Sequence, residues 1–101
     1  MALGALDALG ASKRKALIVG INASREAVDL IKEGRMIASG DFNGFVEGCV
    51  AAQLAIRAIR KQAMPQEAIL RTIVVDKANL GPYELPIDKR PCPTVEAAVG
   101  N

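Results

Sequence analysis

Residues 15–22 have the sequence KALIVGIN, an apolar run that follows a basic turn and ends on a polar residue. Short runs rich in β-branched residues are typical of strands buried on both faces of a parallel sheet. Ser24 is a good helix N-cap, so a helix is expected to begin directly after this strand. Because ligands of open α/β sheets bind at the carboxyl ends of the strands, Asn22 is the first candidate ligand-contacting residue.

Helices and strands alternate along the rest of the chain. The residue patterns predict helices over residues 1–9, 25–33 and 45–62, further strands over 36–39 and 70–76, and a short helical turn over 94–99. Four of the five prolines follow Asp76, so the C-terminal tail is expected to be mostly turn and extended chain. The predicted fold class is α/β, with a three-stranded, mostly parallel sheet, flanking helices and a Pro-rich C-terminal tail.

The composition argues against several classes of protein. A chain of 101 residues suffices for one small domain. Its net charge of +2 and its 3% of aromatic residues indicate no nucleic-acid partner and no dedicated membrane-surface binding. No apolar run approaches the length of a membrane span. In residues 1–15 the basic cluster follows the apolar part, so no signal peptide is predicted.

The reactive side chains form no catalytic or metal-binding pattern. The chain has no histidine, and therefore neither a Ser-His nor a Cys-His pair. Cys49 and Cys92 lack a zinc-site spacing, and no Gly-rich phosphate loop is present. We therefore predict no enzyme activity, no metal and no cofactor. The two cysteines are expected to be free thiols, with a disulfide in an oxidising compartment as the alternative.

Polar residues follow two of the predicted strands, in residues 22–24 and 41–43. If the strands are parallel neighbours, both loops lie at the same edge of the sheet. Asn22 donates and accepts hydrogen bonds, Asp41 accepts them from hydroxyl pairs, and Phe42 offers an aromatic face for sugar C–H groups. This chemistry suits a small neutral sugar or polyol. The alternative is structural, with Asn22 forming a turn and Asp41 and Asn43 capping the next helix.

Several short motifs occur in an order and spacing that resemble one known family. They are MALGAL, IVGINA, EAVDLIKEG and MIAS in the first 39 residues, Gly48 in the long helix, and VVDKAN, RPCP and EAAV toward the end. On these motifs the chain resembles the C-terminal part of type I periplasmic sugar-binding proteins, the ribose-binding-like and LacI-like group that serves ABC transporters.

The resemblance implies two α/β lobes joined by hinge strands, with the sugar held between them. Residues 1–42 would form part of the C-terminal lobe, residues 43–66 a helix that packs on the N-terminal lobe, and residues 67–101 a hinge-return strand and tail. The hinge would lie near Asp41–Phe42 and Asp76–Asn79. The N-terminal lobe is expected to be missing from this chain.

The resemblance also implies a ligand site. Asn22 matches a sugar-hydroxyl contact that is often Asp in relatives, whereas Phe42 stands at a hinge position that is often Gln. Asp41 is the nearest polar substitute for that Gln. The predicted ligand-binding residues are therefore Asn22, Asp41 and Phe42.

The function implied is that of a non-enzymatic sugar-binding component of an ABC-type importer, present as an incomplete C-terminal fragment in the periplasm. Its partners would be the transporter's membrane subunits and the missing N-terminal lobe. The alternatives are the ligand-sensing domain of a LacI-type transcription regulator, a small α/β enzyme, and a nonfunctional truncation product. Copies of the chain are also expected to associate through the apolar stripe of the long helix: Phe45, Cys49, Ala52, Ile56 and Ile59.

Overall fold

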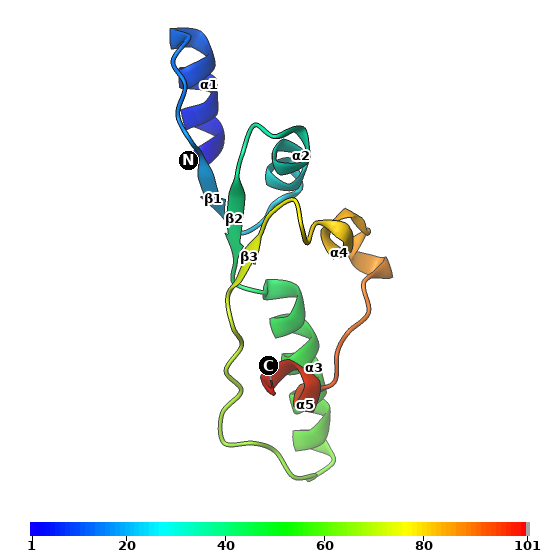
Figure 1. Ribbon diagram of the computed structural model, residues 1–101. Coiled ribbons are helices and arrows are strands. Elements are labelled where there is room, and N and C mark those ends of the chain that lie inside the picture. Colours follow the sequence, from blue (N-terminus) through cyan, green and yellow to red (C-terminus); the bar gives the residue numbers. More distant parts are fainter. Residues whose placement is uncertain (101) are drawn as a thin grey trace.

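A three-stranded mixed sheet lies in the middle of the molecule (Figure 1). The structure, a computed structural model, describes residues 1–100. The sheet has the order β1 (Val19–Ile21), β2 (Ala38–Asp41) and β3 (Ile73–Val75), in which β2 is parallel to β1 and antiparallel to β3. The predicted α/β class is confirmed, but the expectation of a mostly parallel sheet is wrong. Residues 60–72 return toward the sheet along the path of the preceding helix, so β3 enters where β2 leaves (Figure 1).

The sheet is covered on one face only, which corrects the expectation that the first strand is buried on both. Val19 and Ile21 are each 65% exposed, and Val74 on the far strand is 64% exposed. The register aligns Ile21 with Gly40 and Gly40 with Val74, so these positions share one face. Helices lie on the opposite face, where Ser39 and Val75 are fully buried.

Of the first two helices, the second follows its capping signals closely and the first does not. In α2 (Arg25–Glu33), Ser24 Oγ accepts a hydrogen bond from the backbone N–H of Ala27, and Gly34 ends the helix with φ 78°. This agrees with the prediction for residues 25–33. The first helix, α1 (Ala2–Ser12), extends beyond the predicted range of residues 1–9, because the left-handed cap falls on Lys13.

One buried cluster joins α2 to the sheet. It comprises Ala27, Val28, Ile31, Met36, Val75 and Leu80. The helix α4 (Gly81–Glu84) lies beside α2, and Lys32 of α2 pairs with Glu84 of α4. The only buried polar side chain among residues 1–100 is Ser39, whose Oγ accepts a hydrogen bond from the N–H of Ala23 at 3.0 Å. This hydrogen bond holds the strand-exit loop at residues 22–24 against β2.

A second buried cluster lies away from the sheet, between α3 (Gly44–Ile59) and α5 (Val95–Val99). Its buried members are Cys49, Val50 and Val95. Cys49 and Cys92 form a disulfide, so the expectation of free thiols is wrong. The tail folds back onto α3 and brings together two cysteines that lie 43 positions apart. That spacing alone could not indicate the pairing.

The predicted apolar stripe of α3 is only partly covered. α5 covers the helix near Cys49, whereas Ile56 is 47% and Ile59 82% exposed. The association of copies through this stripe stays a prediction. The helix ends at Ile59, a turn earlier than expected, and Lys61 follows with φ 53°.

The molecule is elongated (Figure 1). Its radius of gyration is 17.0 Å and its principal extents are 59 × 24 × 20 Å. A compact domain of this length has a radius of gyration of about 13 Å. α1 projects beyond one end of the sheet and α3 beyond the other. The segment between α4 and α5 contains the 3₁₀ turn η1 (Ile87–Lys89). No helix in the described part of the chain is long and apolar enough to cross a membrane.

Candidate functional site

Two of the three predicted site residues lie along one hollow at the carboxyl ends of β1 and β2. The parallel register places Ile21 beside Gly40, and the N–H of Asn22 donates to the Gly40 carbonyl at 2.6 Å. Asn22 and Asp41 both line a hollow of about 450 Å³. Parallel pairing of these two strands therefore brings their exit loops to one edge.

Phe42, the third predicted residue, lies apart from this hollow. Its side chain is 58% exposed, and it is absent from the lining of the hollow that contains Asn22 and Asp41. Successive residues of an extended strand point to opposite sides. Because Asp41 faces inward, Phe42 is directed away from it.

The turn and capping roles considered for these polar residues hold only in part. Asn22 has a left-handed backbone with φ 79°, a conformation that Asn tolerates better than most residues. Its side chain makes no hydrogen bond within residues 1–100. Asn43 stands at the N-cap of α3, but its side chain makes no capping hydrogen bond. The N–H of Asn43 instead donates to Asp41 Oδ1 at 2.9 Å, which fixes the Asp41 side chain.

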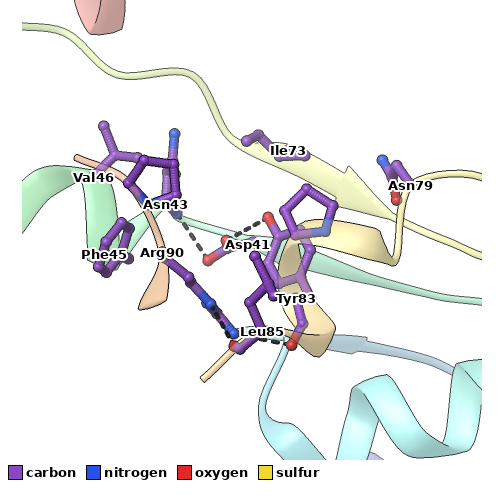
Figure 2. A pocket seen from close by; sticks show the side chains of 11 residues that line it. Asp41, Asn43, Phe45, Val46, Ile73, Asn79, Tyr83, Leu85 and Arg90 are labelled. Atoms are coloured by element: carbon purple, nitrogen blue, oxygen red, sulfur yellow. Dashed lines mark hydrogen bonds between the residues drawn. The ribbon is translucent and has the colours of Figure 1, made fainter. Parts of the chain in front are cut away.

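Asp41 also accepts a hydrogen bond from a residue that the sequence did not single out. The hydroxyl of Tyr83, which lies in α4, donates to Asp41 Oδ2 at 2.7 Å. Arg90 lies against Tyr83, with its guanidinium carbon 5.5 Å from the centre of the ring. Arg90 Nη2 donates to the Tyr83 carbonyl at 3.0 Å, and Arg90 Nε donates to the Leu85 carbonyl at 3.1 Å. Figure 2 shows these contacts, and we call Asp41, Tyr83 and Arg90 the Asp41 cluster.

The electrostatics of the cluster keep the phenol protonated. Burial raises the pKa of Tyr83 above its usual value, and the hydrogen bond to Asp41 and that carboxylate's charge raise it further. The positive charge of Arg90 acts in the opposite direction but more weakly. Arg90 is half-buried and forms no ion pair within residues 1–100. Its guanidinium instead contacts the carbonyls of Tyr83 and Leu85 and the ring of Tyr83.

A second hollow, of about 320 Å³, lies on the other side of the Asp41 cluster. Its walls are mostly apolar and include Phe45, Val46, Ile73 and Pro82 (Figure 2). All three members of the cluster line both hollows. The cluster therefore forms a polar partition between two spaces, one bordered by Asn22 and the other by apolar side chains.

The sequence held only faint signals for Tyr83 and Arg90. Tyr83 is the single tyrosine in a chain poor in aromatic residues, and Arg90 lies within the proline-rich tail. Tyr83 lies 42 positions from Asp41, so no local pattern connects the two. The predicted hinge segment Asp76–Asn79 forms a turn in which the Asp76 N–H donates to Asn79 Oδ1. Whether that turn acts as a hinge stays a prediction.

The cluster offers both hydrogen-bond donors and hydrogen-bond acceptors. The carboxylate oxygens retain free lone pairs, the phenol oxygen can accept, and the guanidinium and amide can donate. Within residues 1–100, no group of three or more His, Cys, Asp or Glu residues could hold a metal ion.

No protein-family model, no curated protein and no solved structure matches this chain. The structure supports a small α/β fold with a three-stranded mixed sheet and flanking helices. A match to a periplasmic-binding-protein fold was not found.

Proposed function

We propose that this chain binds a small neutral sugar or polyol and serves as a solute-binding component of an ABC-type importer. The observation that carries the proposal is the hollow of about 450 Å³ at the carboxyl ends of β1 and β2, which we call the shared hollow because Asn22 and Asp41 both line it. It is lined by Asn22, Asp41, Tyr83 and Arg90. Vicinal hydroxyls both donate and accept, and this set offers an amide, a carboxylate, a phenol and a guanidinium. Ring C–H groups would pack on Phe45.

The exposed apolar surfaces are consistent with a binding site that is completed by a second lobe. The uncovered face of the sheet and the exposed end of α3 both carry large apolar side chains, among them Val19, Ile21 and Ile59. In this proposal residues 1–42 belong to one lobe of a periplasmic binding protein, the helix within residues 43–66 packs on the other lobe, and residues 67–101 return across the hinge. The transporter's membrane subunits would then recognise the closed complex in the periplasm.

Calorimetric titration with a panel of pentoses, hexoses and polyols tests the binding proposal. The Asn22→Ala variant removes a side chain that lines the shared hollow. Losing one buried hydrogen bond costs about 1–3 kcal/mol, so its dissociation constant should rise about 5- to 150-fold.

Phe42→Ala is the matched control, because Phe42 lies in the same loop region but outside the hollow, and it should leave affinity unchanged. If no panel member binds at millimolar concentration, the proposal is wrong. Equal loss of affinity in the two variants would place the site elsewhere.

A further inference from the structure

The tail that carries Arg90 is attached to the rest of the molecule just beyond the Asp41 cluster. Cys92 lies two positions after Arg90 and is joined to Cys49 of α3. Next to it, Gln53 Nε2 of α3 donates to the Pro93 carbonyl at 2.8 Å. These contacts fix one end of the segment that holds Arg90 in place.

Beyond Pro93 the tail contacts α3 through α5. Arg57 of α3 pairs with Glu96 at 2.7 Å, and the Glu96 side chain is 67% exposed. Val95 is the one fully buried side chain of α5. Because the Glu96 carboxylate is largely exposed, the Arg57–Glu96 ion pair contributes little to stability. The tail is therefore held to α3 by the Gln53–Pro93 hydrogen bond, by the packing of buried Val95, and by the disulfide as a covalent link.

The segment between α4 and Cys92 has little support of its own. Nearly all of residues 84–92 are exposed, and they form no strand pairing. One hydrogen bond of Arg90 goes to the Leu85 carbonyl within this segment, and the other goes to the carbonyl of Tyr83 in α4. The position of Arg90 over the Tyr83 ring thus depends on these contacts at one end of the segment and on the attachment at Cys92 at the other.

We propose that the Cys49–Cys92 disulfide is a redox-sensitive anchor that holds the Asp41 cluster in its binding geometry. This inference rests on the proposed function, since the cluster is the site at which the ligand would bind. Breaking the disulfide would free the segment between α4 and Cys92 and let Arg90 move away from Tyr83. Both hollows would then lose one of their walls and open to solvent. Ligand binding would then depend on the thiol–disulfide state of the surroundings.

The step requires a dithiol reductant as co-reactant. A thiolate of the reductant attacks the sulfur of Cys92, which belongs to an exposed residue, and the sulfur of buried Cys49 leaves as a thiolate. The reductant's second thiol then displaces Cys92 from the mixed disulfide. Two electrons and two protons pass to the protein, which gains two thiols, while the reductant becomes a disulfide.

Tyr83 provides a readout that needs no ligand. It is the only tyrosine and the chain has no tryptophan, so tyrosinate absorbance and intrinsic fluorescence report on this residue alone. The full chain is titrated with base in its oxidised form and after treatment with a dithiol. In the reduced form the phenol should ionise at lower pH, because it gains solvent. An unchanged titration after complete reduction would overturn the proposal.

Two controls separate an anchor from a general stabiliser. The double variant C49S/C92S should match the reduced wild type and should not respond to dithiol. Hydrogen exchange should show lost protection in α5 and unchanged protection in α2. Loss of protection in both helices would mean that reduction unfolds the whole chain, and the proposal would be wrong.

Ligand titration of the two redox forms completes the test. For any sugar that binds the oxidised chain, reduction should raise the dissociation constant by about tenfold or more, the equivalent of one lost hydrogen bond from a charged group. If reduction shifts the Tyr83 titration but no sugar binds either form, the anchor is supported and the proposed sugar-binding function fails. If a sugar binds both forms equally, the anchor does not control the site.

Discussion

Replacing Tyr83 with phenylalanine removes one oxygen atom from the centre of the candidate site and leaves its shape unchanged. The hydroxyl donates to a carboxylate oxygen of Asp41 at 2.7 Å, and hydrogen bonds to charged groups contribute about 1.5–3 kcal/mol. Asp41 is only half-buried, so water partly replaces the lost donor. We therefore expect Tyr83→Phe to lower the free energy of unfolding by about 1.5 kcal/mol, at the lower end of that range.

Urea unfolding measures this loss. With a slope of about 1–3 kcal/mol per molar urea, the midpoint should fall by about 0.5–1.5 M. The ring contact with Arg90 survives in the variant, so the loss isolates the hydroxyl. Phe42→Leu is the surface control and should change stability by less than about 0.5 kcal/mol.

A double-mutant cycle with Asp41→Ala tests whether the two residues act as a pair. If the hydrogen bond is present, the double variant should lose less than the sum of the two single variants, by about 1 kcal/mol. Additive losses, within about 0.3–0.5 kcal/mol, would show that Tyr83 and Asp41 do not interact in solution.

Three other predictions concern pH, the disulfide and the larger buried cluster. The folded-state pKa of Tyr83 is raised, so its contribution to stability is complete below the unfolded-state pKa of about 10 and is lost as pH rises above that value. The loss of stability that Tyr83 causes at alkaline pH should be absent in Tyr83→Phe when the free energy of unfolding is measured against pH. Reducing the Cys49–Cys92 disulfide should lower the free energy of unfolding by up to about 4 kcal/mol, the chain-entropy value for its 43-residue separation, as measured by urea unfolding with and without dithiol; a loss below about 1 kcal/mol would contradict the contribution assigned to this cross-link. Ile31→Ala should cost about 2–5 kcal/mol because Ile31 is 0% exposed, whereas Ile59→Ala at an 82% exposed position should cost less than about 0.5 kcal/mol in the same assay; similar losses would argue against the burial of Ile31.

The sequence predicted the elements whose signals are local. α2 begins at the cap Ser24 and ends at Gly34 as expected, because capping groups act on backbone atoms within one helical turn. The meeting of the loops at Asn22 and Asp41 also follows from local order, since a single helix joins their two parallel strands. Such a connection places both strand ends at one edge.

The features that the sequence did not predict depend on contacts between distant segments. The antiparallel direction of β3 depends on the path of residues 60–72, which carry no strong local signal. The Cys49–Cys92 pairing and the Tyr83–Asp41 hydrogen bond both depend on where the proline-rich tail folds back. The orientation of Phe42 depends on strand alternation, which reverses with a shift of one residue in the strand boundary.

The position of β1 at one side of the sheet has a consequence for solubility. An edge strand has free N–H and C=O groups, and here its outer face also carries apolar side chains at Val19 and Ile21. A second chain adding to this edge in parallel register would align the basic residues Lys13, Arg14 and Lys15 of both copies. Their repulsion acts as a gatekeeper against strand addition, and salt screens such repulsion beyond about 10 Å at 0.1 M. Aggregation of this chain should therefore increase with ionic strength.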